Sequence, residues 1–159
     1  MIDPYEFRRV LGHFPSGVTV VTTLRPGAEP CGLTVNAFSS VSLEPPLVMV
    51  CVEREAVSHD CIIEYGRFAV NMLTDEEGER LARHFAQPQV GDKFDGVAWS
   101  PSRAGVPILD RALAWVDCTV VKAVEGGDHT IFIAEVTDGD AHEGHPLVYY
   151  RGRYGRFDP

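Results

Sequence analysis

The fold class is decided by the stretch Val18-Thr19-Val20-Val21-Thr22-Thr23-Leu24. All of its residues before Leu24 are valine or threonine, and such β-branched side chains favour β-strands. The following residues, 25–30, contain a Pro-Gly and a Glu-Pro pair and are typical of a hairpin loop. Cys31–Val35 is the expected return strand. The sequence therefore predicts a pair of strands near its start.

Further strands follow this pair along the chain. They are expected at Leu47–Glu53, Arg67–Leu73, Ala112–Val124, Thr130–Asp138 and Pro146–Tyr150. The Gly126-Gly127 pair between two of these strands is a strong signal for a hairpin turn. The basic tail that follows the last strand, residues 151–157, is expected to form an edge strand.

Three helices are expected between or before the strands. Asp3 and Pro4 provide a cap and a first helical residue, and an apolar stripe at helical spacing follows at Phe7, Val10, Leu11 and Phe14. The other two helices are expected at 57–65 and 75–86, whereas 87–110 reads as an irregular covering segment. Because strands outnumber helices and no βαβ alternation occurs, we predict a mainly β (β-rich α+β) fold, a closed or split antiparallel barrel with peripheral helices.

Length and charge limit the classes of protein to consider. The 159 residues are enough for a single domain, 1–159, and the 14 basic against 23 acidic residues give a net charge of −9. That charge argues against a nucleic-acid binder and against a polybasic membrane anchor. The start of the chain has no signal-peptide pattern and no apolar run is long enough to cross a bilayer, so we expect a cytoplasmic protein.

The cysteines and histidines do not predict a metal site. The four cysteines form no CxxC pair and lie in apolar surroundings, where a thiol behaves as a small hydrophobic group. His142 and His145 lie close in sequence, but Gly144 and Pro146 exclude a helix face and no third ligand is evident. We expect a solvated loop there and no bound metal.

The segment Gly32–Ser42 is the most informative for function because it carries a run of small hydroxyl and amide side chains. Such a loop can bind a phosphate or the polar edge of a heteroaromatic ring through side chains and free backbone N–H groups. The alternative is an ordinary turn rich in serine and asparagine, which composition alone favours. The sequence contains neither a GxGxxG nor a Walker motif.

Several motifs occur together and in a fixed order. Residues 14–23 read FPSGVTVVTT, 32–46 read GLTVNAFSSVSLEPP, 68–73 read FAVNML, 93–97 read KFDGV, 127–132 read GDHTIF and 146–152 read PLVYYRG. Over nearly the whole chain, they resemble the flavin reductase domain family. These proteins are the small NAD(P)H:flavin oxidoreductase components of two-component flavin-dependent monooxygenases. The resemblance implies a split antiparallel β-barrel of the FMN-binding type.

The resemblance also implies which residues bind the cofactors. Thr34, Asn36 and Ala37 would line the isoalloxazine edge, and Ser39 and Ser40 would face the ribityl chain and phosphate. The remaining flavin positions are Gly32, Leu33, Cys51, Val52, Glu53, Ser58, Lys93 and Phe94. Ser58 would meet the phosphate at the start of a helix. The family often has a serine-rich stretch here, whereas this chain has Glu53-Arg54-Glu55-Ala56-Val57-Ser58, so FMN and FAD both stay open.

His129 matches the family's histidine near the nicotinamide cofactor, where Tyr150 and Arg151 would complete the pocket. The implied reaction passes a hydride from NADH or NADPH to FMN or FAD, and the reduced flavin then reaches a partner monooxygenase. His129 is the candidate catalytic residue, as a group that positions the nicotinamide rather than as a base. A homodimer is expected, because a small split barrel exposes apolar edges that a second copy would cover. The alternative function is a non-catalytic flavin-binding or electron-carrier protein on the same barrel.

Overall fold

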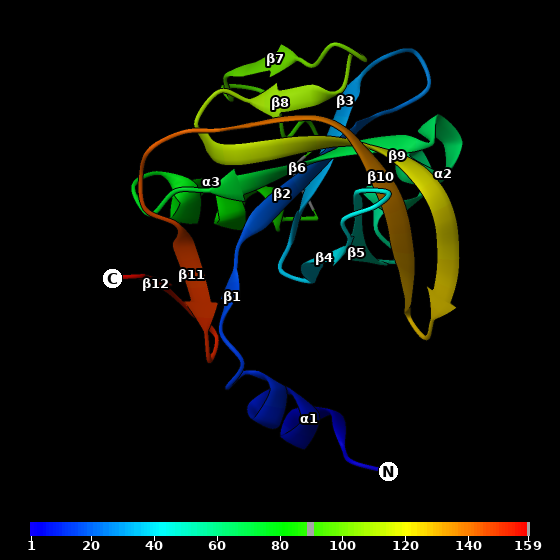
Figure 1. Ribbon diagram of the computed structural model, residues 1–159. Coiled ribbons are helices and arrows are strands. Elements are labelled where there is room, and N and C mark those ends of the chain that lie inside the picture. The colour runs from blue at the N-terminus through cyan, green and yellow to red at the C-terminus, as the bar shows by residue number, and fades with distance from the viewer. Residues whose placement is uncertain (89–90, 159) are drawn as a thin grey trace.

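The computed structural model describes residues 1–88 and 91–158, and in this part of the chain β-strands predominate (Figure 1). A seven-stranded sheet has the order β3-β2-β6-β9-β10-β5-β4, and each strand is antiparallel to its neighbours. Its strands are β2 (Thr19–Leu24), β3 (Pro30–Val35), β4 (Phe38–Ser42), β5 (Leu47–Glu53), β6 (Arg67–Leu73), β9 (Ala112–Gly126) and β10 (His129–Ala141). The prediction of a mainly β fold is confirmed.

The long hairpin of β9 and β10 is the largest single pairing in this sheet. It runs from Gly126 opposite His129 at the turn to Ala114 opposite Ala141 at the far end, so both strands are longer than predicted. Gly127 in the turn has a φ of +74°, which glycine adopts without the steric cost of a side chain. Two register shifts interrupt the ladder and bend the hairpin over the rest of the sheet (Figure 1).

The sequence of strand β2 does not alternate between core residues and solvent-facing residues. All of its residues from Thr19 to Leu24 are buried, because both faces of the strand are covered. Val21 packs into one core with side chains of β5, β6, β10 and helix α2 (Val57–Tyr65). Val20 faces a second core beneath helix α3 (Gly78–Phe85). The valine-threonine run therefore separates two apolar layers.

A second small sheet lies beside the first and includes the end of the chain. It has the order β1-β11-β12, formed by β1 (Ser16–Gly17), β11 (Leu147–Tyr150) and β12 (Arg153–Arg156). Strand β12 lies at its edge, which confirms the edge strand expected of the basic tail. The adjoining Arg151 has a φ of +50° in the turn between β11 and β12.

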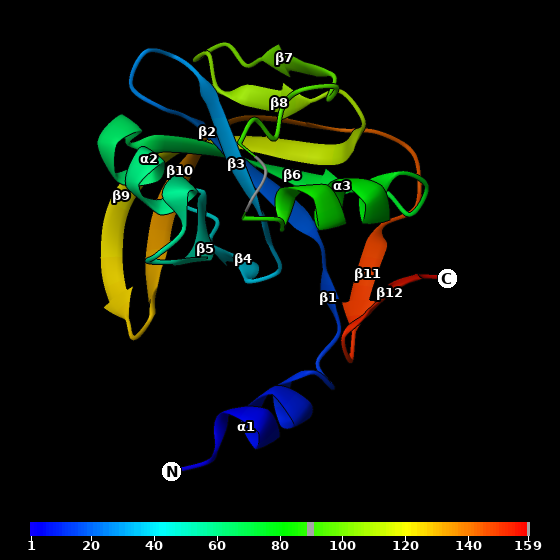
Figure 2. The ribbon, with the colours of Figure 1, turned by 180° about the vertical axis from the view of Figure 1, so that it is seen from behind.

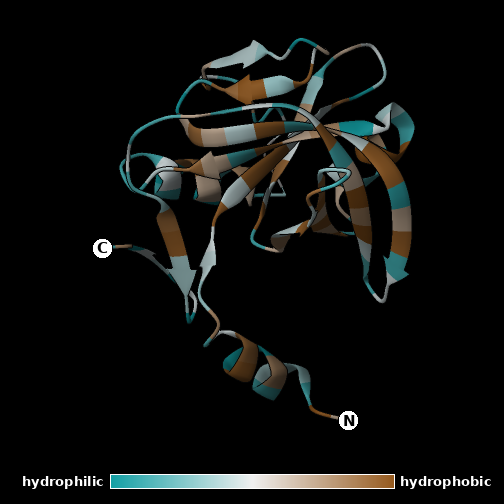
Figure 3. Ribbon diagram, viewed as in Figure 1, coloured by the Kyte–Doolittle hydropathy of each residue, from teal (hydrophilic) through white to brown (hydrophobic). Residues whose placement is uncertain are grey.

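Helix α1 (Pro4–Leu11) begins as predicted but packs differently. The Asp3 carboxylate accepts the backbone N–H groups of Tyr5 and Glu6, at 2.9 and 3.0 Å. The helix extends away from the sheets, and none of its residues is buried (Figures 1 and 2). Several residues of this helix are coloured brown in Figure 3, so the helix carries apolar residues although none of them is buried. Among the described residues, no helix is long and apolar enough to cross a membrane.

Three segments differ from the sequence-based expectations. The Gly32–Ser42 segment is not one open loop, because residues 38–42 form β4 and pair with β5. Helix α3 begins at Gly78 rather than near 75, since residues 75–77 form a turn in which the Thr74 hydroxyl accepts the Glu77 N–H. The segment expected to be irregular contains the short hairpin of β7 (Trp99–Pro101) and β8 (Pro107–Leu109). Residues 89 and 90 of that segment lie outside the described part.

Asn71 joins this short hairpin to the main sheet. Its side chain is fully buried, and its Nδ2 donates to the Val20 carbonyl and the Thr22 hydroxyl, both at 3.0 Å. Its Oδ1 accepts the Leu109 N–H at 2.8 Å. One amide thus satisfies polar groups of β2 and β8 that have no access to water.

We expect Asn71→Ala to lower the free energy of unfolding by about 2–4 kcal/mol, because it leaves the buried Leu109 N–H without a partner and opens a small cavity. Denaturant unfolding followed by circular dichroism measures this loss. Ser100→Ala is the control, since it removes a hydrogen bond from the exposed Ser100 hydroxyl to Asp110. A cost for Asn71→Ala no larger than that of the control would contradict the role of this amide.

Candidate functional site

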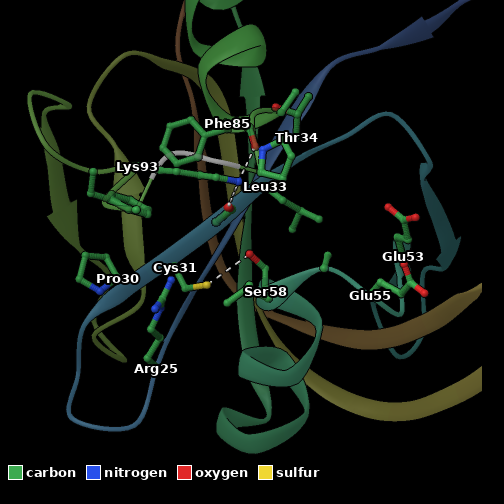
Figure 4. Close-up of a pocket in the computed structure, with 17 residues that line it drawn as sticks. Arg25, Pro30, Cys31, Leu33, Thr34, Glu53, Glu55, Ser58, Phe85 and Lys93 are labelled. Atoms are coloured by element: carbon green, nitrogen blue, oxygen red, sulfur yellow. Dashed lines mark hydrogen bonds between the residues drawn. The ribbon is translucent and has the colours of Figure 1, made fainter.

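A cleft of about 440 Å³ opens along the edge strand β3 (Figure 4). Its walls come from β3, the end of β5, the first turn of α2, the end of α3 and the segment after it. This volume lies in the range typical of small-molecule sites. The cleft collects seven of the predicted site residues, namely Gly32, Leu33, Thr34, Glu53, Ser58, Lys93 and Phe94.

The apolar wall of the cleft depends on Gly32. A Cβ atom at this position would lie 3.1 Å from the Val21 carbonyl oxygen and 3.2 Å from the Phe85 ring. The absence of a side chain lets the ring of Phe85 rest against β3, where it also contacts Phe94 edge-on at 5.2 Å between centroids. A larger residue at position 32 would push this aromatic pair out of place.

Two cationic side chains lie at one end of the cleft. Lys93 is half-buried, and its Nζ donates to the carbonyl oxygens of Phe85 at 2.9 Å and Gly32 at 3.4 Å. Burial lowers the pKa of Lys93, and the charge of Arg25 lowers it further. Arg25 is the first residue after β2, and its Nε is buried without a hydrogen-bond partner among the described residues. In Figure 4, Lys93 lies above Ser58, and Arg25 lies below it and to the left.

Carboxylates lie at the opposite end. Glu53 and Glu55 line the cleft there, well apart from Arg25 in Figure 4. Glu53 ends β5 and pairs directly with His129, the first residue of β10. The imidazole is 43% exposed, and its Nδ1 lies 2.7 Å from the Asp128 carboxylate. This contact lowers the pKa of Asp128 and holds the imidazole ring through its Nδ1 atom.

Two hydroxyl groups in the cleft already have protein partners. Thr34 donates from Oγ1 to the Ala82 carbonyl at 2.6 Å, which ties β3 to α3. Ser58 is buried near the start of α2, and its Oγ lies 3.2 Å from the Cys31 Sγ. The first turn of α2 has no side-chain cap, because the N-cap residue is Ala56. Ser58 therefore lies where the positive end of the helix dipole meets the cleft.

Six further predicted residues do not line the cleft. Asn36 and Ala37 link β3 to β4, and the Ala37 carbonyl accepts the Cys51 N–H at 3.0 Å. Ser39 and Ser40 are exposed on β4, whereas the Val52 side chain is packed in the core. The Oδ1 atom of Asn36 is buried without a hydrogen-bond partner among the described residues, so it is an acceptor available to a ligand.

Tyr150 and Arg151 lie in a different part of the structure. They end β11 and begin its turn, where the Arg151 N–H donates to the Gly12 carbonyl at 3.0 Å and the Tyr150 ring contacts His13 edge-on. Neither residue lines the cleft within the chain itself. Their predicted contribution to the nicotinamide pocket stays a prediction.

Sequence reasoning missed several cleft residues, above all Arg25, Cys31, Glu55 and Phe85. Phe85 belongs to the expected helix 75–86 and is buried at the end of α3, where it also forms a wall of the cleft. Cys31 was interpreted as a core thiol and is indeed buried. The sequence offers one indication for Arg25, because it is a single basic residue directly after a buried strand. Within residues 1–88 and 91–158, no group of three potential metal ligands is found.

The sequence and fold match proteins of known activity. Residues 11–158 match the flavin reductase like domain. An NADH-dependent FAD reductase of Streptomyces globisporus is 44% identical over 100% of this chain and 90% of that protein. The reductase component of a 4-nitrophenol 4-monooxygenase/4-nitrocatechol 2-monooxygenase of Rhodococcus opacus is 44% identical over 99% of this chain and 83% of that protein.

Among solved structures, the NADH:FAD oxidoreductase of Streptomyces globisporus in complex with NAD and FAD fragments superposes with a TM-score of 0.92. It is 41% identical, and the alignment covers 100% of this chain and 97% of that chain. These matches include every element that lines the cleft.

Proposed function

The chain belongs to the flavin reductase like domain family, and from this premise we propose that it is an NADH-dependent flavin reductase that supplies reduced flavin to a partner monooxygenase. The observation that carries this proposal is the cleft along β3, with cations at one end and the Glu53–His129 pair at the other. The flavin is FAD or FMN.

The residues of the cleft fit a flavin nucleotide. Arg25 and Lys93 supply positive charge for a phosphate, and the Phe85 ring supplies an apolar wall. Asn36 does not line the cleft but directly follows β3, and its buried Oδ1 is an acceptor that a ring N–H would satisfy. When bound, the nicotinamide provides the hydride and the flavin accepts it. The protein's own residues bind the two cofactors, orient them and exclude water.

His129 has the role of positioning the nicotinamide. Its place opposite Glu53 puts it at the rim of the cleft, half-exposed and oriented by Asp128. An imidazole held in this way can donate or accept one hydrogen bond toward a carboxamide. The residue touches the reacting cofactor without moving a proton in the hydride transfer itself.

We also propose that residues 1–159 form one domain whose curled sheet is a split barrel. The support is that Val35 of β3 and Val50 of β5, from opposite sides of the sheet order, pack in the same core. A cytoplasmic location follows from the proposed reaction, because NADH is supplied there.

A homodimer is the last part of the proposal. Helix α1 exposes Phe7 and Leu11 to 52% and 51%, and Phe14 beyond it to 80%. Apolar side chains in such a row are commonly covered by a partner. A second copy of this chain would bury them against its own surface.

The function is tested with purified protein, NADH and added FMN or FAD. We expect NADH oxidation, followed by its absorbance, to depend on the added flavin. Tight flavin binding without NADH turnover would indicate a carrier protein. Absence of any flavin binding would exclude both functions.

We expect His129→Ala to raise the KM for NADH about threefold to tenfold, the equivalent of one lost hydrogen bond, and to change the KM for flavin much less. Steady-state kinetics with each substrate varied in turn measures the two constants. Lys122→Ala, an exposed change on β9 away from the cleft, is the control. A larger rise in the flavin KM would reject the assigned role.

We expect the double change Phe7→Glu and Leu11→Glu to convert the dimer to a monomer, because charged side chains cannot be buried unpaired in an apolar interface. Light scattering coupled to gel filtration gives the mass. Arg9→Gln is the matched control, since it alters the exposed Glu6–Arg9 ion pair of the same helix and leaves the apolar side chains intact. A wild-type protein that is monomeric at micromolar concentration would overturn the dimer.

A further inference from the structure

Arg25 is the least explained charged residue in the cleft. It follows the buried strand β2 directly, and its backbone N–H donates to the Glu29 carbonyl at 2.7 Å, which closes the hairpin loop. Its guanidinium forms no ion pair with a carboxylate among the described residues. A contact with the Cys31 side chain raises the pKa of Arg25, but its Nε is buried without a hydrogen-bond partner in the described part of the chain. A buried N–H group left unpaired is costly, so its presence indicates a site for an acceptor.

Lys93 is arranged in a related way. Two of its three ammonium hydrogens are directed to the Phe85 and Gly32 carbonyls, which leaves one for a ligand. The pKa of Lys93 is lowered first by burial and then, in part, by the charge of Arg25. The Arg25 charge acts on Lys93, and a bound anion would relieve this repulsion and the desolvation of Lys93.

The opposite end has the reverse charge. Glu53 and Glu55 would repel an anion placed beside them, and Figure 4 shows them across the cleft from Arg25 and Lys93. Ser58 lies between the two ends, in the uncapped first turn of α2. The cleft is therefore positively charged at one end and negatively charged at the other.

We propose that Arg25 and Lys93 together bind the phosphate of the flavin nucleotide. This contact makes Arg25 a specificity-determining residue, which selects phosphorylated flavins over riboflavin. This proposal rests on the proposed flavin reductase function. The ligand chemistry is a phosphate ester attached to the ribityl chain, which FMN carries as a monophosphate and FAD as part of a pyrophosphate. A guanidinium suits either because it offers several donors in one plane.

The direction of the bound flavin follows from this contact. With the phosphate at Arg25, the ribityl chain passes Ser58 and the ring system lies toward Thr34 and the Glu53 end. That end carries His129 across the β5–β10 pairing. The charges of the cleft and the position of His129 therefore indicate the same orientation. The phosphate lies at the Arg25 end, and the isoalloxazine ring lies at the end near His129, where the nicotinamide is proposed to bind.

The test compares riboflavin, FMN and FAD in wild-type protein and in Arg25→Gln. We expect the KM and the equilibrium dissociation constant for FMN and FAD to rise about 10- to 100-fold, the range of a charge-assisted hydrogen bond, and those for riboflavin to change less than about twofold. Arg25→Lys is expected to retain part of the discrimination. Arg80→Gln, which removes an exposed arginine of α3 that faces Glu77 at 3.7 Å, is the matched control.

Flavin fluorescence titration measures binding without NADH, so the role of Arg25 is decided even if the protein fails as a reductase. Equal weakening of riboflavin, FMN and FAD in Arg25→Gln would overturn the proposal. A loss confined to NADPH relative to NADH would also overturn it, because the arginine would then serve the nicotinamide nucleotide. Circular dichroism melting of each variant separates these results from misfolding, and Arg25→Lys keeps the charge if Arg25→Gln does not fold.

Discussion

The burial of strand β2 on both faces is the constraint on which the rest of the structure depends. Val21 on one face and Val20 on the other belong to two different apolar cores, so the strand cannot shift by one residue without exchanging their partners. Its position fixes β3 on one side and β6 on the other. The cleft lies along β3, and Arg25 follows the last residue of β2. The site is therefore positioned by the most deeply buried part of the sheet.

Sequence reasoning found the elements whose patterns are local. Strands β5 and β6 and helix α2 were predicted at their observed limits, because a buried run or an apolar stripe ends at a clear signal such as Gly66. The segment 32–42 was interpreted as a loop, since serine and asparagine favour turns. In the fold, pairing with β5 overrides that preference, and a strand's hydrogen bonds to a distant segment leave little trace in its own composition.

The candidate site shows the same division between local and distant information. Motif similarity indicated the residues on β3 and at the start of α2 that line the cleft. It did not indicate Arg25 or Glu55, whose importance comes from facing each other across a space formed by five separate segments. The net charge of −9 opposed an anionic ligand on average. An anionic ligand can nevertheless bind, because Arg25 and Lys93 provide positive charge within the cleft.

Helix α1 has a thermodynamic consequence. It has eight residues and no buried side chain, while isolated helices shorter than about 12–15 residues are marginal in water. The Asp3 cap contributes only about 1 kcal/mol to such a helix. In the proposed homodimer, the second copy would cover the apolar side chains of this helix and stabilise it. The rate of amide hydrogen exchange in the helix would then report the fraction of the protein that is dimeric.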